Sequence, residues 1–281
     1  MKNRRIPPGF WFLLPGLLGF LLFYILPFGG SVGYSVMSQP VNGKFVGVQN
    51  YLSLLASPAY LRGLWNTVKF MGVSVPLNMA LSLGVALLIR KKRHRELFTL
   101  IFLIPLVLPS GSMAFFWRVV FSYNGALNGA LQGLGIGKVN WLDSALALPV
   151  MVLIFIWKNM GYNMVLFLSG LHSIPMEYYE AAWVDGASPR QALWSITLPN
   201  LAATSVLVCI MSVVNSFKVF REIYLLTGNY PHQSIYTLQH FMNNMFASLN
   251  YPKLTTATTI LVCIIAVLTQ GLLWLERRTS S

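Results

Sequence analysis

The residues that could do chemistry in this chain are few, and they form no catalytic pattern. The histidines are scattered along the sequence, at His94, His172, His232 and His240. Cys209 and Cys263 both lie inside apolar runs and are interpreted as small core residues rather than as a disulfide or a metal site. The sequence contains no Gly-x-x-x-x-Gly-Lys-Ser/Thr phosphate loop, so the chain is not expected to bind ATP itself. We predict no catalytic residue, no metal ligand and no bound cofactor.

One polar stretch, residues 177–199, interrupts an otherwise apolar sequence and holds three of the seven acidic residues. We predict a short helix over about 176–184, a turn at Gly186, and a second helix that begins at Ser188-Pro189. Ser188 suits the N-cap, because its hydroxyl can accept a bond from a free backbone N–H, and Pro189 suits the first helical position. Because the stretch lies between two membrane-length segments, we expect it to be held by another protein.

The composition is that of a polytopic membrane protein. Of the 281 residues, 56% are hydrophobic and only 10% are charged, whereas roughly a quarter of a soluble domain is charged. The net charge of +13 could suggest a nucleic-acid-binding protein. The basic residues, however, sit at the ends of apolar segments, as topology signals do, so no nucleic acid is expected as a partner.

A membrane-spanning helix needs roughly 20 mostly apolar residues, and the sequence has six such segments. We predict an all-α fold with one transmembrane domain over residues 1–281 and spans at about 10–29, 64–89, 98–120, 146–169, 200–220 and 256–275. The first segment resembles a secretory signal after Lys2, Arg4 and Arg5, but its apolar run exceeds the roughly 7–15 residues of a signal core. We interpret it as a retained span.

The distribution of basic residues predicts the orientation. With six spans, the loops on the side of the two termini carry eleven lysines and arginines, and the opposite loops carry five. The positive-inside rule therefore places both termini, residues 90–96 and residues 177–199 in the cytoplasm. The basic residues from Arg90 to Arg95 are expected to contact anionic membrane lipid.

Two further features mark the segments and the loops between them. Prolines lie within or at the ends of the spans, at Pro15, Pro27, Pro76, Pro105, Pro109 and Pro149. They predict bends of the kind found where a pathway opens, although prolines are also simply common in membrane helices. The outer loops 38–61 and 124–143, with their glycines and asparagines, are expected to be compact.

The polar stretch carries a specific resemblance. Glu180-Ala181-Ala182, three residues, Gly186, nine residues and then Ile196-Thr197-Leu198-Pro199 resembles the EAA signature of the inner-membrane permease subunits of binding-protein-dependent ABC importers. Residues 171–175 (Leu-His-Ser-Ile-Pro) and 185–188 (Asp-Gly-Ala-Ser) resemble the sugar branch, of the maltose and glycerol-phosphate type. Further matches from Phe45 to Thr227 extend the resemblance over nearly the whole chain.

The resemblance implies a type I ABC importer permease fold and a role for the polar stretch. In this family, the cytoplasmic helix pair fits a cleft in an ATP-hydrolysing subunit and moves with it. Carried over by position, the residues that couple to the ATPase are Glu180, Ala181, Ala182, Asp185 and Gly186. Glu180 would make a charged contact, and Gly186 would make a turn with positive φ. The alternative interpretation is an ordinary solvated loop helix.

The resemblance also implies partners and a location. The expected partners are a second homologous permease subunit, a dimeric ATPase that uses ATP and Mg²⁺, an extracytoplasmic solute-binding protein and membrane lipid. The expected location is the bacterial cytoplasmic (inner) membrane, with several spans.

For the substrate pathway, the resemblance to maltose-type relatives implies sugar-contacting positions on the third, fourth and fifth spans. These positions are Ser110, Lys158, Asn159, Tyr162, Ser212, Ser216 and Val219. Polar side chains in hydrocarbon are usually functional, and a hydroxylated solute needs donors, acceptors and an aromatic face. Lys158 could pair with an acidic group on the substrate or extend to the lipid headgroups. Asn78, Asn215 and Lys218 are interpreted as residues that pack helices.

Three alternatives to a carbohydrate permease remain. An ion-coupled carrier would need buried acids, and no acid lies within the six spans as assigned. A membrane-embedded enzyme would need convergent His, Asp or Cys residues, which the sequence lacks. An ABC permease for a non-sugar solute is the third, because residues 228–231 and 250–253 depart from the family pattern in the loop expected to meet a binding protein.

Overall fold

The computed structural model describes residues 8–90 and 92–279, and most of these residues are helical. Within these ranges there is no strand, and one isolated antiparallel bridge joins Met37 to Phe45. The all-α prediction is therefore confirmed. The chain divides into two compact units, one within residues 1–61 and 242–265 and the other within residues 62–241 and 266–281.

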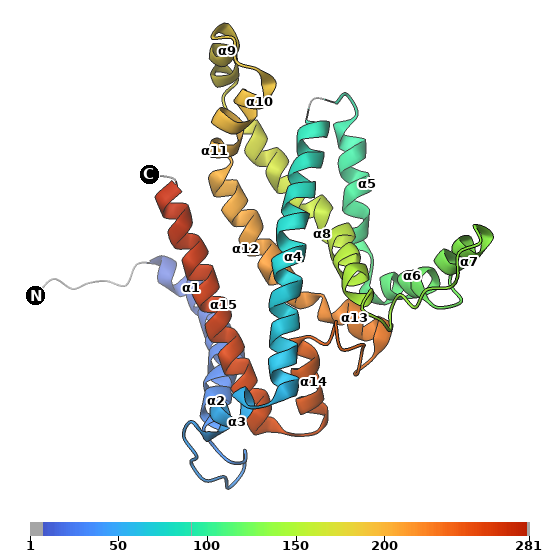
Figure 1. Cartoon of the computed structure of the whole chain (residues 1–281). Coiled ribbons are helices and arrows are strands. Elements are labelled where there is room, and N and C mark those ends of the chain that lie inside the picture. Colours follow the sequence, from blue (N-terminus) through green and yellow to red (C-terminus); the bar gives the residue numbers. More distant parts are fainter. Residues whose placement is uncertain (1–7, 91, 280–281) are drawn as a thin grey trace, which may run out of the picture. The chain divides into compact units, whose positions relative to one another are not determined.

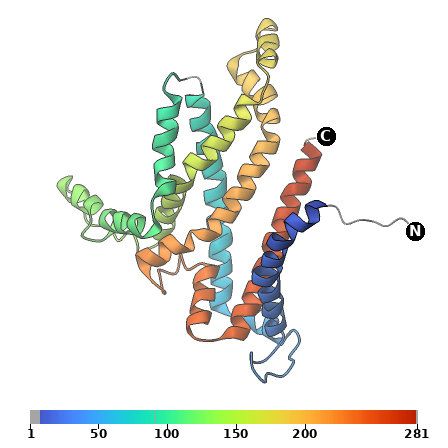
Figure 2. The same cartoon turned by 180° about the vertical axis from the view of Figure 1, so that it is seen from behind.

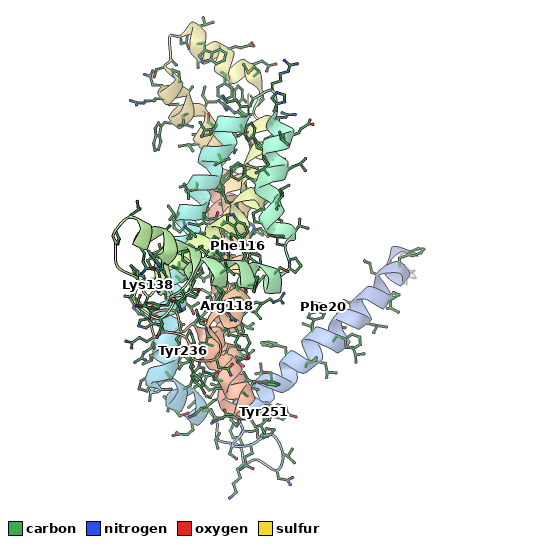
Figure 3. The ribbon with its side chains drawn as sticks, turned by 90° about the vertical axis from the view of Figure 1, so that its right-hand side faces the viewer. Phe20, Phe116, Arg118, Lys138, Tyr236 and Tyr251 are labelled. Atoms are coloured by element: carbon green, nitrogen blue, oxygen red, sulfur yellow. The ribbon has the colours of Figure 1, made fainter. Side chains whose placement is uncertain are left out.

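The first unit begins with a long apolar helix. It consists of α1 (Pro8–Phe20), the π-helical segment η1 (Leu21–Ile25) and α2 (Leu26–Ser35). Residues 12–35 are long and apolar enough to cross a membrane, and none of the most apolar part is buried. Phe20, labelled in Figure 3, is 51% exposed. An uninterrupted apolar helix with its side chains exposed is what a lipid-facing span requires.

Ser35 is a polar anchor of this first unit, and it is fully buried. Its hydroxyl shares a hydrogen bond of 2.6 Å with the Tyr51 hydroxyl on α3 (Gln49–Leu55). Its carbonyl oxygen accepts hydrogen bonds from Asn50 Nδ2 at 2.9 Å and from Thr256 Oγ1 at 3.3 Å. The backbone at the end of α2 therefore has side-chain partners, as a buried carbonyl requires.

The second unit contains most of the remaining helices. They are α4 (Pro58–Ile89), α5 (Arg95–Val107), α6 (Ser110–Phe121), α7 (Ala126–Gly133), α8 (Ala147–His172), α9 (Met176–Val184), α10 (Pro189–Ala192), η2 (Leu193–Thr197), α11 (Leu198–Asn200), α12 (Ala202–Lys218) and α13 (Phe220–Thr227). Three helices have residues in both units: α4, whose residues 58–61 belong to the first unit, α14 (Leu238–Ala247) and α15 (Tyr251–Thr279). In the described part, five helices could cross a membrane, and a sixth if α5 and the bent segment after it count as one span.

Helix α8 lies at the centre of the second unit, between α5 and α12 (Figures 1 and 2). More than half of the residues in its most apolar stretch are buried. Met164 and Phe167 pack in one core cluster with Ala86 of α4 and Val208 of α12. A polar contact accompanies this packing: Asn163 Nδ2 of α8 donates a hydrogen bond to Ser212 Oγ of α12 at 2.8 Å. Interhelical hydrogen bonds of this kind hold membrane helices together.

The third predicted span, 98–120, is broken in the structure. Helix α5 ends at Val107, α6 begins at Ser110, and α5 is bent by 96° from the segment Ser110–Gly133. Leu108 and Pro109 have extended ψ values of 132° and 137°. Proline has no backbone N–H and pushes the preceding residue out of the helical region, so Leu108-Pro109 ends α5 and starts a new helix.

Residues 124–143, expected to form an outer loop, are compact as predicted and fold around Asn128. This side chain is fully buried. Its Nδ2 donates to the carbonyl oxygens of Tyr123 and Val139, at 3.0 and 2.8 Å, and its Oδ1 accepts from Val139 N and Trp141 Nε1. One asparagine that uses both its donors and its acceptor holds the two ends of α7 in place.

A close approach of α5 to α8 gives a test of this packing. A Cβ added to Gly161 of α8 would lie 1.9 Å from the Phe102 carbonyl oxygen of α5, whereas a Cβ added to Gly84 of α4 would meet nothing within 4 Å. Overpacking typically costs about 1–3 kcal/mol, while alanine in a helix is favoured over glycine by up to about 1 kcal/mol.

We therefore expect Gly161→Ala to lower the melting temperature of the purified transport complex by several degrees, measured by intrinsic fluorescence in detergent. Gly84→Ala is the matched control and should leave it unchanged or slightly raised. An unchanged melting temperature for Gly161→Ala would contradict the close packing of α5 on α8.

Candidate functional site

Helix α9 presents the residues of the polar stretch to the solvent. Glu180, Ala181 and Asp185 are exposed, and Ala182 is partly buried. No described residue forms an ion pair with Glu180 or Asp185. The carboxylate of Glu180 is therefore free to meet a cationic group of another molecule.

Gly186 ends α9 in a Schellman motif. Its φ is +80°, in the region that only glycine adopts without strain. The N–H of Ala187 donates to the carbonyl oxygen of Ala182 at 2.8 Å, and the N–H of Gly186 donates to that of Trp183 at 3.1 Å. These two bonds satisfy carbonyl groups that the helix end would otherwise leave free. The predicted turn with positive φ is confirmed, and Ala182 of the signature contributes its carbonyl oxygen to it.

Ser188 and Pro189 begin the second helical segment as predicted. The Ser188 hydroxyl accepts a bond from Gln191 N, and the Gln191 side chain accepts one from Ser188 N, which makes a capping box. The segment then runs through α10, η2 and α11 rather than as one regular helix. The buried Tyr179 hydroxyl hydrogen-bonds to Thr197 Oγ1 at 2.9 Å and so ties α9 to η2. We call α9 together with the segment from α10 to α11 the helix pair.

The loop between α4 and α5 contacts the base of the helix pair. The Arg90 guanidinium lies 5.7 Å from the centroid of the Tyr179 ring, in cation–π geometry. Arg95 Nη1 lies 2.8 Å from His172 Nε2, at the end of α8. Two residues of the basic loop therefore hold the point where α8 leads into α9.

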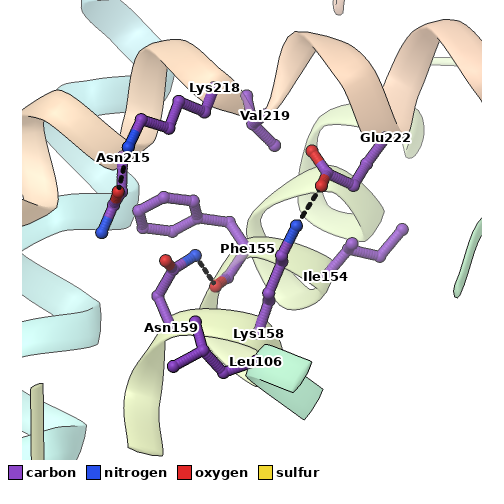
Figure 4. A pocket seen from close by; sticks show the side chains of 9 residues that line it. All are labelled: Leu106, Ile154, Phe155, Lys158, Asn159, Asn215, Lys218, Val219 and Glu222. Carbon is purple, nitrogen blue, oxygen red and sulfur yellow. Dashed lines mark hydrogen bonds and ion pairs between the residues drawn. The ribbon is translucent and has the colours of Figure 1, made fainter. Parts of the chain in front are cut away.

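Near the middle of α8, a cavity of about 190 Å³ opens between α5, α8, α12 and α13 (Figure 4). Its lining combines apolar, amide and charged side chains: Leu106, Ile154, Phe155, Lys158, Asn159, Asn215, Lys218, Val219 and Glu222. Asn159 Nδ2 donates to the Phe155 carbonyl oxygen at 2.8 Å, and Lys218 Nζ donates to Asn215 Oδ1 at 3.3 Å. Cavities with this mixture of groups are typical of small-molecule sites.

An ion pair between Lys158 and Glu222 forms one wall of this cavity, and it is the sole ion pair in the described part of the chain. The Glu222 side chain is 4% exposed and that of Lys158 is 22% exposed. Ser110 Oγ, on the first turn of α6, donates to the same Glu222 oxygen at 3.1 Å. The carboxylate thus joins α6, α8 and α13 at one point.

Glu222 corrects one prediction and adds a partner that was not foreseen. The fifth predicted span ended at residue 220, but the apolar helical stretch runs from Ala202 to Thr227 and includes Glu222. An acid therefore does lie buried within a span. For Lys158 the sequence left open an acidic group on the substrate or the lipid headgroups, and in the structure its partner is Glu222. The signal in the sequence was an acid two residues beyond the assigned end of the span. Its partner lies 64 residues away, so no local pattern revealed the pair.

The structure brings some of the predicted pathway residues together and places others apart. Lys158, Asn159 and Val219 line the cavity, and Ser110 reaches it through Glu222. Ser212 is buried against Asn163, and Ser216 donates to the Val213 carbonyl oxygen. Neither serine, nor the partly buried Tyr162, is among the lining residues. Their contact with a solute stays a prediction.

The strained turn at Gly186 provides a test of the helix pair. A Cβ at this position would meet nothing within 4 Å, so a substitution acts through backbone strain alone. A β-branched residue in this region is strained by about 1–2 kcal/mol, whereas asparagine tolerates it better.

We expect Gly186→Val to speed amide exchange of Gly186 and Ala187 by about tenfold, the equivalent of 1.4 kcal/mol, measured by hydrogen–deuterium exchange on the purified complex. Gly186→Asn is the control and should stay close to the wild type. Equal exchange in the two variants would show that positive φ is not what holds this turn.

Comparisons with known proteins agree on one family. The family model described as "Binding-protein-dependent transport system inner membrane component" matches residues 78–281. The chain is 35% identical over 237 residues to the trehalose/maltose transport system permease protein MalF of Thermococcus litoralis, which covers 82% of this chain and 80% of that protein.

Two solved structures share the fold. One, of a bacterial ABC transporter for import of the acidic polysaccharide alginate, matches with a TM-score of 0.85 and 22% identity over 97% of this chain and 96% of that one. The other, of the alginate transporter in complex with a periplasmic protein bound to an alginate pentasaccharide, matches with a TM-score of 0.82 and 22% identity over 96% and 93%. The chain belongs to the family of inner-membrane components of binding-protein-dependent transport systems.

Proposed function

We propose that this chain is a permease subunit of an ATP-driven importer and forms part of the pathway for a carbohydrate-type solute. The observation that carries the proposal is the continuity of α8. This helix lines the cavity through Ile154 to Asn159 and ends at His172, three residues before the helix pair begins. One rigid element therefore connects a solute-sized cavity to a segment that bears the EAA signature.

The helix gives a direct mechanical link. From Lys158 to His172, α8 covers about 21 Å at ~1.5 Å per residue. The Arg95–His172 and Arg90–Tyr179 contacts hold α4 and α5 to the same end. A displacement of the helix pair would move α8 together with these neighbours, and the cavity would open or close in response.

The energy for this motion comes from a separate subunit, in our proposal. A dimeric ATPase would bind ATP and Mg²⁺ and receive the helix pair in a cleft on the face that it turns to the membrane. The exposed surface of the pair suits such a partner, because Met176, Tyr178, Val184 and Trp194 are each at least half exposed around Glu180. Exposed aromatic and methionine side chains are typical of protein interfaces.

The remaining partners follow from the same role. A second homologous permease subunit would complete the pathway, and an extracytoplasmic binding protein would deliver the solute to the outer loops. The alginate transporter solved with its periplasmic protein supports this arrangement. We place both termini in the cytoplasm of a bacterial cell, with the helix pair, on the basis of the basic loops. The spans themselves contact membrane lipid.

Family membership argues against an ion-coupled carrier. The argument from the sequence, that no acid lies within the spans, no longer holds. Glu222 is a buried acid of the kind that such carriers use. It is, however, already paired with Lys158 and hydrogen-bonded to Ser110. An acid that couples an ion to transport would have to be free to exchange partners, whereas this carboxylate is held between two groups of the chain.

Glu180→Arg tests the proposal, and Glu177→Arg is the matched control, because both acids are exposed on α9 and only Glu180 belongs to the signature. Reversing a charge at a tight joint costs several kcal/mol. We expect Glu180→Arg to reduce ATP-dependent uptake of radiolabelled oligosaccharides into cells by about a hundredfold, near 2.7 kcal/mol.

Glu177→Arg should retain uptake within a factor of about two. Membrane levels of the chain are measured by immunoblot, so that loss of expression is separated from loss of coupling. Wild-type uptake in Glu180→Arg would refute the coupling role. A wild-type complex that takes up no carbohydrate in a panel of neutral and acidic oligosaccharides would refute the solute class.

A further inference from the structure

The comparisons leave open whether the cavity accepts a charged or an uncharged solute. The relative from Thermococcus litoralis is named for trehalose and maltose, which are uncharged, and the solved neighbour imports an acidic polysaccharide. The cavity itself contains two ammonium groups, Lys158 and Lys218, and one carboxylate, Glu222. The way in which these three groups are paired decides what the cavity attracts.

Lys158 is the cation that would select an anionic solute if it stood alone. Its side chain is 22% exposed, and an ammonium in a membrane-spanning helix interacts strongly with any nearby charge. A carboxylate or phosphate on a solute would be its natural partner. In the structure Glu222 already forms an ion pair with this ammonium, in the wall of the cavity (Figure 4).

Glu222 is held in this position by the fold. It is on α13, which packs along α6, and Arg118 of α6 donates to the Leu225 and Leu226 carbonyl oxygens of α13 at 2.7 and 3.2 Å. Ser110, also on α6, donates to the carboxylate itself. An acidic solute would have to displace a pre-positioned carboxylate from Lys158 and then lie beside it, at a cost from like-charge repulsion.

The second ammonium differs from the first in its surroundings. Lys218 is exposed and donates to the side chain of Asn215. Water and salt screen a charge in such a place, so its attraction for an anion is weak. The rest of the lining offers the amides of Asn159 and Asn215 and the ring of Phe155. Uncharged hydroxyl groups and the apolar face of a sugar ring suit these partners.

We propose that Glu222 is a specificity-determining residue that makes the cavity select uncharged saccharides over acidic ones. The inference rests on the proposed function, since it assumes that the cavity holds the solute. The volume of about 190 Å³ is below the roughly 300–1,000 Å³ of drug-sized sites, so a single unit of a saccharide would occupy it.

The test measures equilibrium binding of two radiolabelled probes, maltotriose and trigalacturonate, to the complete transport complex in lipid nanodiscs. The binding protein is left out, so that the permease alone discriminates, and hydrolysis is blocked with ATP bound. The readout is the ratio of the two affinities. Because a ratio is independent of the fraction of active complex, partial assembly of a variant does not distort it.

We expect the wild type to favour maltotriose and Glu222→Gln to shift the ratio toward trigalacturonate by about tenfold, the effect of one uncompensated charge worth near 1.4 kcal/mol. Glu177→Gln makes the same change at an exposed acid of α9 that does not line the cavity, and it is the matched control. Its ratio should stay within about twofold of the wild type.

The double variant Lys158→Met/Glu222→Gln keeps the test valid if Glu222→Gln fails to assemble. Removing one charge of a buried ion pair leaves the other charge without a partner and is strongly destabilising, whereas removing both charges together is often tolerated. With neither charge present, the cavity should retain its preference for maltotriose. Loss of that preference in the double variant would overturn the inference.

The remaining outcomes separate this inference from the proposed function. A wild-type complex that favours trigalacturonate, or a Glu222→Gln ratio equal to the wild type, overturns the role of Glu222 and leaves a carbohydrate permease standing. If neither saccharide binds the wild-type complex and no carbohydrate is taken up by cells, the carbohydrate function fails and the inference fails with it.

Discussion

Burial of α8 among its neighbours is the constraint on which the second unit depends. In a hydrocarbon environment every backbone polar group of a span must be satisfied within the helix, so the side chains alone determine how helices pack. Gly161 lets α5 approach to backbone contact, Asn163 bonds to Ser212 of α12, and Ser82 of α4 donates to the Met160 carbonyl oxygen at 3.1 Å. Three helices are thus fixed to α8 within one turn.

This packing gives α8 two roles along its length. The first half contacts α6 and α13 through Val150 and Ile154 and forms the cavity wall. The second half, around Met164 and Phe167, belongs to the core that also contains Tyr179 of the helix pair. The apolar core is therefore continuous from α8 into the helix pair, and α9, which the turn at Gly186 ends, exposes Glu180 of the signature. A rigid packed connection of this kind is what a lever requires.

The sequence predicted the features that depend on local patterns. The five long apolar helices, the positive φ of Gly186 and the cap at Ser188 all follow from hydropathy and from the stereochemistry of individual residues. The break at Leu108-Pro109 was also visible in principle, since proline restricts the residue before it. Pro109 was among the prolines expected to bend the spans, but residues 98–120 were still assigned to a single span.

The features that the sequence did not predict are those that depend on tertiary contact. Lys158 and Glu222 pair across 64 residues, and Asn128 collects its partners from both sides of a loop. The family resemblance marked both Asn159 and Ser212 as candidates, but only packing shows that the first lines the cavity and the second bonds to Asn163. A single sequence records which residues are polar and leaves open what they face.

The most direct measurement of the central claim, that the helix pair drives the cavity through α8, is the ATP-dependent accessibility of the cavity. Asn215→Cys would place one thiol in the cavity lining, with Cys209 and Cys263 replaced by alanine. Its rate of reaction with a membrane-impermeant maleimide is measured in right-side-out vesicles, with and without trapped ATP. We predict several-fold faster labelling with ATP, and no difference once Glu180→Arg is added. A nucleotide effect that persists in Glu180→Arg, or labelling that never responds to ATP, would contradict the account.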